Sequence, residues 1–229
     1  MVDFHCHCLP GIDDGSQSVE ESIKILEMLS HQGVNSVVAT PHFIANNETV
    51  ESFLQRRKKS YEELSENLHD NLPDIKLGAE VEYYDGISSL TDLKKLCIEG
   101  TNILLLEMPN VRWTQGVINE LYRLVSMGNL QIMLAHIERC LFLQDWQVVD
   151  YLLRNDVIMQ SNASHFIQLF TKRKACKYLR DNIIHVLGSD SHNITSRPPR
   201  IKEALDVIEK KLGNIVLEHL KNVSRDIIN

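Results

Sequence analysis

The sequence predicts an α/β protein whose strands form a distorted seven-stranded (β/α)7 barrel, similar to a TIM barrel. Short apolar runs alternate with amphipathic stretches, and one such unit recurs about every 25–35 residues. The runs are almost continuously apolar, as in strands that are buried on both faces of a parallel sheet. The first run is not followed by a Gly-x-Gly-x-x-Gly motif, which disfavours an open, dinucleotide-binding sheet.

The predicted strands are apolar runs that each end in polar residues. They cover residues 2–5, 36–40, 75–81, 103–107, 131–136, 157–161 and 184–189. Because the connecting segments are long and amphipathic, we expect neighbouring strands to be parallel.

Helical periodicity fills the segments between these runs. Ser18 and Glu21 form a capping box before an apolar stripe, and Gly33 is typical of the end of that helix. Gly128 is a similar stop signal after residue 127. The further predicted helices cover residues 50–68, 116–127, 146–154, 165–180, 201–212 and 216–220.

Composition narrows the class of protein. The chain has 229 residues, of which 43% are hydrophobic and 24% are charged, as in a soluble globular protein, and we expect a single domain over residues 1–229. With 24 basic and 31 acidic residues, the formal net charge is −7. The chain has no basic block that would bind the phosphates of nucleic acid.

The cellular location is predicted from the cysteines and from hydropathy. The five cysteines include no Cys-x-x-Cys pair, which favours reduced thiols in the cytoplasm over a disulfide framework. The first residues lack the basic and apolar regions of a signal peptide, and no run approaches the ~20 apolar residues of a transmembrane helix. We therefore expect a cytoplasmic protein without membrane insertion.

Ionisable side chains lie at or just after nearly every predicted strand end. In an α/β barrel these ends share one face, where the chemistry takes place. Six of the seven ends offer histidine or a carboxylate, and the remaining end offers the amide of Asn162. The ionisable residues are His5, His7, Asp13, Asp14, His42, Glu80, Glu82, Glu107, His136, Asp190 and His192.

The spacing of these residues favours metal binding. His5 and His7, two positions apart, point to the same side of a strand, and Asp190 and His192 repeat that spacing. Imidazole with carboxylate and without cysteine suits Mn, Fe or Zn at a hydrolytic centre better than a structural thiolate site. A bridging carboxylate such as Glu80 would allow two ions about 3.5–4 Å apart, as in phosphoryl hydrolysis.

Eight short motifs occur in order along the chain. They are DFHCH at 3–7, DDG at 13–15, TPH at 40–42, GAE at 78–80, LLE at 105–107, AHIER at 135–139, GSDSHN at 188–193 and RPP at 197–199. Together they resemble the polymerase-and-histidinol-phosphatase (PHP) superfamily, and more narrowly its bacterial capsular-polysaccharide tyrosine phosphatases of the Gram-positive type. The resemblance covers essentially the whole chain and implies the distorted seven-stranded PHP barrel.

The resemblance also implies a manganese centre of two to three ions, at which Fe, Co or Zn could replace Mn. The first ion would be held by His5, His7, Glu80 and Asp190. The second would share Glu80 and add Glu107 and His136. The third would be held by Asp14, His42 and His192.

Two arginines are the candidates for binding the phosphoryl group. Arg139 follows His136 by three residues, and Arg197 precedes two prolines. A guanidinium binds phosphate through paired hydrogen bonds, and both arginines match family positions implicated in phosphate binding. A cysteine-dependent tyrosine phosphatase would instead need Cys-x5-Arg. The residues six positions after the five cysteines are Ile12, Asp14, Ile103, Trp146 and Asn182, so the cysteine route is excluded.

The function implied by the resemblance is hydrolysis of phosphotyrosine, with the tail of a bacterial tyrosine autokinase that controls capsule or exopolysaccharide synthesis as the partner. Two alternatives stay open: a small-molecule phosphatase of the same superfamily, such as a histidinol-phosphatase, and a non-catalytic metal-binding domain. The DDG and RPP motifs favour the capsule branch. The net charge disfavours a nuclease, and the sequence leaves the oligomeric state open.

Overall fold

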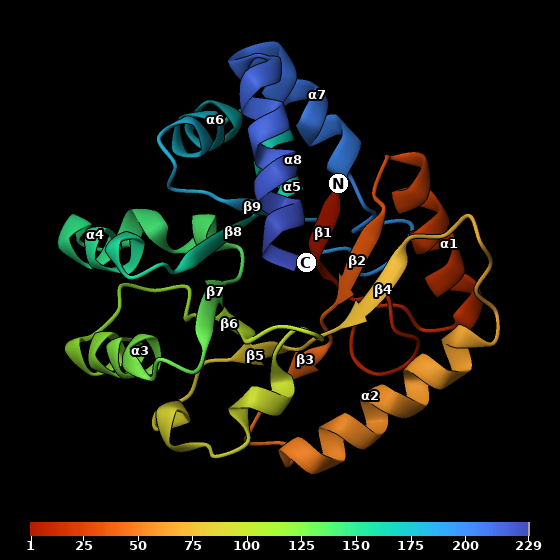
Figure 1. The fold of residues 1–229 in the computed structure, drawn as a ribbon, viewed down its shortest axis with the longest axis horizontal. Coiled ribbons are helices and arrows are strands. Elements are labelled where there is room, and N and C mark those ends of the chain that lie inside the picture. Colours follow the sequence, from red (N-terminus) through yellow and green to blue (C-terminus); the bar gives the residue numbers. More distant parts are fainter. Residues whose placement is uncertain (229) are drawn as a thin grey trace.

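Parallel strands occupy the centre of the structure, and helices surround them (Figure 1). The computed structural model describes residues 1–228. The strands are β1 (Val2–Cys6), β2 (Ser36–Ala39), β3 (His42–Phe43), β4 (Asp74–Leu77), β5 (Glu80–Glu82), β6 (Ile103–Glu107), β7 (Gln131–Leu134), β8 (Ile158–Asn162) and β9 (Val186–Gly188). The helices are α1 (Val19–His31), α2 (Val50–Ser65), α3 (Gln115–Ser126), α4 (Trp146–Arg154), α5 (Ala163–Ile167), α6 (Lys172–Arg180), α7 (Ile201–Leu212) and α8 (Asn214–Ile228). Short 3-10 helices cover Ile87–Ser89, Leu93–Leu96, Ile137–Arg139 and Leu141–Leu143.

The predicted α/β class with parallel strands is confirmed, whereas the seven-stranded count is not. Within residues 1–228, nine strands form a three-stranded sheet, β1-β2-β4, and a six-stranded sheet, β3-β5-β6-β7-β8-β9. The predicted strand 75–81 is interrupted, because Gly78 lies between β4 and β5, and an additional short strand, β3, follows Pro41 just after the predicted strand 36–40. Proline has no N–H for the ladder and glycine weakens a strand.

The helices agree with the sequence pattern at their starts better than at their ends. Ser18 caps α1, since its side chain accepts a hydrogen bond from Glu21 N at 3.2 Å. The predicted helix 165–180 is wrong as a single helix: it is split into α5 and α6, and the Thr171 hydroxyl donates to the His165 carbonyl at 2.6 Å at the break. The predicted helix 216–220 is much too short, because α8 extends to Ile228.

Two apolar layers hold the strands in place. Side chains on the outer faces pack beneath the helices, whereas a smaller cluster fills the interior near the amino ends of the strands. The interior cluster contains Val2, Phe4, Val38, Ile98, Ile103, Leu105, Met133, Ala135, Ile158, Val186 and Ile228. Helix α8 contacts β1 and β9 and contributes Val223, Ile227 and Ile228 to this cluster, so it closes the amino ends (Figure 1).

An irregularity in β1 positions the first predicted ligands. The register of β1 against β2 shifts between Asp3 and Cys6. As a result Phe4 packs in the interior apolar cluster, while Cys6 packs in the outer layer. Such a bulge changes which side chains face inward, and it brings His5 and His7 to the polar end of the interior.

No helix within residues 1–228 has the length and apolar character needed to cross a membrane. The single domain over residues 1–229 stays a prediction, and residue 229 lies outside the described residues.

Candidate metal centre

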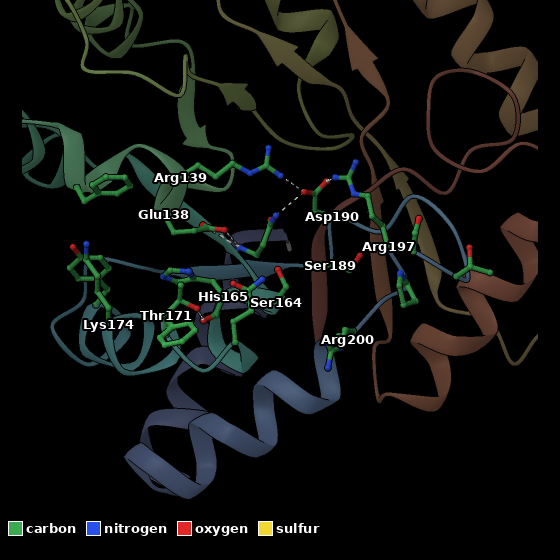
Figure 2. Close-up of a pocket in the computed structure, with 18 residues that line it drawn as sticks. Glu138, Arg139, Ser164, His165, Thr171, Lys174, Ser189, Asp190, Arg197 and Arg200 are labelled. Atoms are coloured by element: carbon green, nitrogen blue, oxygen red, sulfur yellow. Dashed lines mark hydrogen bonds and ion pairs between the residues drawn. The ribbon is translucent and has the colours of Figure 1, made fainter.

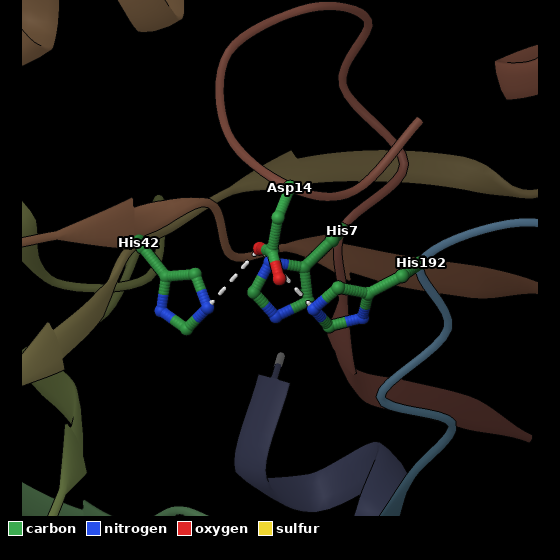
Figure 3. Close-up of side chains that lie close together, drawn as sticks. All are labelled: His7, Asp14, His42 and His192. Atoms are coloured by element: carbon green, nitrogen blue, oxygen red, sulfur yellow. Dashed lines mark ion pairs between the residues drawn. The ribbon is translucent and has the colours of Figure 1, made fainter. Parts of the chain in front are cut away.

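All nine residues predicted as metal ligands lie together at the carboxyl ends of the strands. They form overlapping groups in which the ligand atoms lie within 4.8 Å of one another. The groups are His7 with Asp14, His42 and His192; His5 with His7 and Asp190; His5 with Glu80 and His136; and His42 with Glu80 and Glu107. Figure 3 shows the first group, in which Asp14 Oδ1 lies 3.5 Å from His42 Nε2 and 3.4 Å from His192 Nε2.

Glu80 lies at the centre of these groups. Its side chain is 1% exposed, and Oε1 lies 2.8 Å from His136 Nε2. Its other oxygen, Oε2, lies 3.0 Å from His5 Nε2, 3.2 Å from His7 Nε2 and 3.1 Å from His42 Nδ1. Although three ring nitrogens are this close, Oε2 has no hydrogen bond to any described residue.

The same surroundings test whether the residues fit a metal. His5 Nε2 and His7 Nε2 are only 3.1 Å apart, and His192 Nε2 is buried without a hydrogen-bond partner among residues 1–228. Buried polar atoms without partners are costly. A divalent cation can coordinate several imidazole nitrogens and carboxylate oxygens that lie this close together. The mixture of nitrogen and oxygen ligands suits first-row transition metals. The residues therefore fit a metal centre.

A second layer of polar residues orients the ligands. Asp13 Oδ2 lies 2.8 Å from His7 Nδ1 and accepts the His42 backbone N–H at 3.0 Å. Gln160 Oε1 lies 3.3 Å from His5 Nδ1 and accepts the His136 N–H at 2.6 Å. Holding Nδ1 in this way directs Nε2 of each ring toward the centre.

The sequence interpretation assigned no role to Asp13 and missed Gln160. A usable signal was present for Gln160, which lies within the predicted strand 157–161 and is fully buried. A buried amide in an apolar run needs hydrogen-bond partners. Here those partners are two of the predicted ligands.

The two predicted arginines approach the centre from its rim. Arg139 Nη2 donates to Asp190 Oδ2 at 2.6 Å, and Arg197 Nη2 donates to Asp190 Oδ1 at 2.9 Å (Figure 2). Asn162 Nδ2 also donates to Asp190 Oδ2, at 2.7 Å. The arginine side chains are 38% and 41% exposed, so an incoming anion can reach both guanidinium groups. A cavity of about 1040 Å³ opens beside them.

The backbone is unusual at two of the strand ends. His136 has φ +29° and Asp190 has φ +51°, a region that non-glycine residues seldom adopt. Gly188 has a different constraint, because a Cβ atom there would lie 2.5 Å from His5 Cβ. Strained positions of this kind concentrate at functional sites, in agreement with the clustering of the predicted ligands.

Charge pairing shifts the pKa values of the cluster in opposite directions. Burial opposes a charge on His7, yet the hydrogen bond with Asp13 and the negative charge of the nearby Glu80 carboxylate raise its pKa to about 10. Burial also opposes ionisation of Glu80, but the charge of His5 and a hydrogen bond with His136 hold the pKa of Glu80 well below its usual range. Glu80 is therefore ionised at neutral pH, and metal binding would displace the proton from His7.

Comparison with known proteins identifies the family. Residues 1–227 match the family described as capsular polysaccharide synthesis, CpsB/CapC. The chain belongs to the CpsB/CapC family. This confirms the relationship that the sequence motifs predicted.

Relatives within the CpsB/CapC family are similar over almost their whole length. The tyrosine-protein phosphatase CpsB of Streptococcus pneumoniae is 31% identical over 229 residues, covering 93% of this chain and 91% of that protein. The tyrosine-protein phosphatase YwqE of Bacillus subtilis is 28% identical, with 93% and 86% covered. A solved chain among the YwqE and CpsB structures, described as metal-dependent tyrosine phosphatases, has a TM-score of 0.83 at 23% identity, covering 100% of this chain and 94% of that one. That similarity establishes a shared fold.

Proposed function

We propose that this protein is a metal-dependent protein-tyrosine phosphatase. The observation that carries the proposal is the convergence of nine nitrogen and oxygen ligands beside two exposed guanidinium groups at the mouth of a cavity. The names of the CpsB and YwqE relatives support the same activity.

The metal ions are assigned to the groups predicted from the motifs, as two to three Mn²⁺ with Fe, Co or Zn as substitutes. One ion would be held by His5, His7, Glu80 and Asp190, a second by Glu80, Glu107 and His136, and a third by Asp14, His42 and His192. All nine residues belong to the overlapping groups described above, which supports a shared centre. Bound divalent ions supply positive charge for the phosphoryl oxygens and a water molecule acidic enough to ionise at neutral pH.

Arg139 and Arg197 bind and orient the phosphoryl group. Asp190 now holds one nitrogen of each guanidinium, which leaves further N–H groups of both free to donate to phosphoryl oxygens. These donors stabilise the charge that develops on the phosphoryl group during hydrolysis. Because the phenolate of tyrosine is a good leaving group, the proposal assigns no general acid.

The cysteines support a metal route over a thiolate route. All five are buried, and none is followed six positions later by arginine. Burial raises the pKa of Cys140 to about 12 and that of Cys97 to about 11. A thiolate nucleophile would need the opposite shift.

The proposed substrate is the phosphorylated tail of a bacterial tyrosine kinase that regulates capsule or exopolysaccharide synthesis, and the proposed location is the cytoplasm. Membership of a capsular polysaccharide synthesis family supports the pathway. The five free cysteines agree with a reducing compartment.

Hydrolysis of p-nitrophenyl phosphate with added Mn²⁺, before and after chelation, tests the activity. Metal-dependent turnover is expected, and its absence in a protein that binds Mn²⁺ would favour the non-catalytic alternative. Competition between a phosphotyrosine peptide and histidinol phosphate tests the substrate class. A strong preference for histidinol phosphate would contradict the tyrosine phosphatase proposal and favour the small-molecule alternative.

We also propose that the nine short strands correspond to the seven positions of a distorted barrel. Strand β2 pairs Ser36 with Asp74 of β4, and β3 pairs His42 with Glu80 of β5, each pair 38 positions apart. The unchanged register supports two interrupted strands rather than four separate ones. Closure is supported by the hydrogen bonds from Asp190 N to His5 O at 2.8 Å and from His7 N to Ser191 O at 2.9 Å.

A further inference from the structure

The cavity beside the metal centre extends well past the arginines. Arg139, Asn162, Asp190 and Arg197 line one side of it, and Phe142, His165, Lys174 and Tyr178 line another. In Figure 2, Lys174 and Arg197 lie on opposite sides of the cavity, with His165 between them. A ligand that contacts both sides must span the cavity.

Lys174 is an unusual cation within this cavity. Arg139 and Arg197 pair with Asp190, and Arg200 pairs with Glu203 at 2.7 Å. Among residues 1–228, by contrast, Lys174 has no carboxylate within ion-pair distance. Its Nζ lies 5.0 Å from the centre of the Phe142 ring and 5.4 Å from that of the Tyr178 ring. Aromatic faces hold an ammonium group in position without neutralising its charge.

His165 provides a second unsatisfied group in the same cavity. Its Nε2 is buried and has no hydrogen-bond partner in the described part of the chain. Burial and then the charge of Lys174 lower the pKa of His165 to about 4. The ring is therefore neutral at pH 7, and its Nε2 lacks the hydrogen bond that a buried polar atom needs.

The surroundings favour an acidic peptide as that ligand. Lysine or arginine occupies five of the nine positions of α6, Lys172–Arg180, and no acidic residue lies between them, although the whole chain carries a net charge of −7. Phe142 is 60% exposed and Phe170 is 94% exposed, and both line the cavity. Exposed rings add contact area for a polypeptide, which an inorganic ion would not use.

We propose that Lys174, supported by Phe142 and His165, forms a second subsite that binds the carboxylate of an acidic residue near the phosphotyrosine in the substrate chain. This inference rests on the proposed phosphatase activity and assigns substrate selectivity to α6. Lys174 acts at a distance from the reacting phosphoryl group, so it contributes to KM for a peptide and leaves kcat unchanged.

Steady-state kinetics on a set of phosphotyrosine peptides tests the subsite. In each peptide a single Asp, or Asn as its neutral counterpart, occupies one position on either side of the phosphotyrosine. At one or more positions the wild-type protein should show a KM about threefold lower for Asp than for Asn. Lys174→Glu should reverse that preference, with an increase in KM of roughly tenfold for the best Asp peptide.

Arg173→Glu is the matched control, because it makes the same charge change at the next residue, which does not line this cavity. Both side chains are exposed, so both variants should fold. With p-nitrophenyl phosphate, which has no carboxylate for Lys174 to bind, the two variants should match the wild-type protein.

Three results would overturn the inference. The first is equal turnover of Asp and Asn peptides at every position, and the second is an equal effect of Lys174→Glu and Arg173→Glu. The third is obtained with a peptide that carries a second phosphotyrosine in place of the Asp. If that replacement lowers KM more than Asp does, and the difference depends on Lys174, the ligand of the subsite is a phosphate. Failure of the wild-type protein to hydrolyse any phosphotyrosine peptide would instead contradict the proposed function.

Discussion

The two ends of the same strands carry opposite chemistry. On β6, Leu105 and Glu107 are two positions apart, so they share a face. Leu105 is fully buried in the interior apolar cluster, whereas Glu107 is 27% exposed and lies 3.3 Å from His136 at the metal centre. The amino end is closed by α8 and packed with aliphatic side chains. The carboxyl end gathers the candidate metal ligands, among which Glu80 Oε2 and His192 Nε2 are buried without a hydrogen-bond partner in residues 1–228.

This difference indicates that stability and function come from separate ends of one framework. Burial of apolar side chains supplies most of the folding free energy, and the amino end provides it within the strands. The carboxyl end gathers charges that are unfavourable together without bound cations. Substitutions at the two ends should therefore have separable effects.

Loss of a ligand at the carboxyl end should have the largest effect. We expect His136→Ala and Asp190→Ala each to reduce turnover of p-nitrophenyl phosphate about a thousandfold or more, since each removes metal and phosphoryl stabilisation. Far-UV circular dichroism should match that of the wild-type protein. An unaltered rate in either variant would mean that the site is misplaced. A loss of fold would mean that the two ends are not separable.

A large-to-small substitution in the apolar core at the amino end should lower stability and leave activity nearly unchanged. We expect Ile103→Ala, at the first residue of β6 and in the interior apolar cluster, to lower the free energy of unfolding by about 2–5 kcal/mol, as measured by urea denaturation. The kcat of the folded protein should stay within about twofold, because the metal centre is intact and a surviving fold preserves its geometry. Glu107→Ala on the same strand is the paired variant, and it should change activity much more than stability. Equal losses of activity in the two variants would break the comparison.

The sequence predicts the carboxyl end better than the framework that positions it. Histidines and carboxylates after apolar runs are visible as motifs, so the resemblance that these motifs carry named all nine candidate ligands that the structure brings together. The bulge in β1 could not be predicted, because no residue from Val2 to Cys6 indicates the register shift. That shift places Phe4 and His5 in neighbouring parts of the interior.

Longer-range features escaped prediction for a similar reason. The break between α5 and α6 depends on the Thr171 hydroxyl reaching the His165 carbonyl, and the length of α8 depends on its packing against β1 and β9. Gln160 could be recognised as a buried amide, but its contacts with His5 and His136 come from two other strands. Tertiary contacts of this kind are not encoded in local periodicity.

Metal removal should affect stability through the carboxyl end alone. At a free Mn²⁺ concentration of 100 times its Kd, the folded protein should be about 2.7 kcal/mol more stable than after chelation, and the melting temperature should rise accordingly. The gain should be preserved in Ile103→Ala and strongly reduced in Asp190→Ala. Differential scanning calorimetry with and without chelator measures both. A gain of equal size in Asp190→Ala would exclude its carboxylate as a ligand.

The smallest expected effect concerns a histidine that precedes β9 at the amino end. His185 Nδ1 accepts the Met159 N–H at 2.9 Å, and burial, only partly opposed by a hydrogen bond with Asn182, lowers the pKa of His185. Because the folded-state pKa lies below the unfolded value of about 6.5, the stability from the neutral ring is complete above that pH and is lost as pH falls through the folded-state pKa. The control variant is His185→Asn, whose amide oxygen accepts the same hydrogen bond without acquiring a charge. In metal-free protein, the ionisable cluster at the carboxyl end is the same in both proteins, so its protonation cancels when the two are compared. Between pH 7.5 and 5, urea denaturation should show the free energy of unfolding of the wild-type protein falling by about 1 kcal/mol more than that of His185→Asn. Parallel stability curves would contradict this, and would mean that His185 stays neutral over this range or that its hydrogen bond contributes nothing to the amino end.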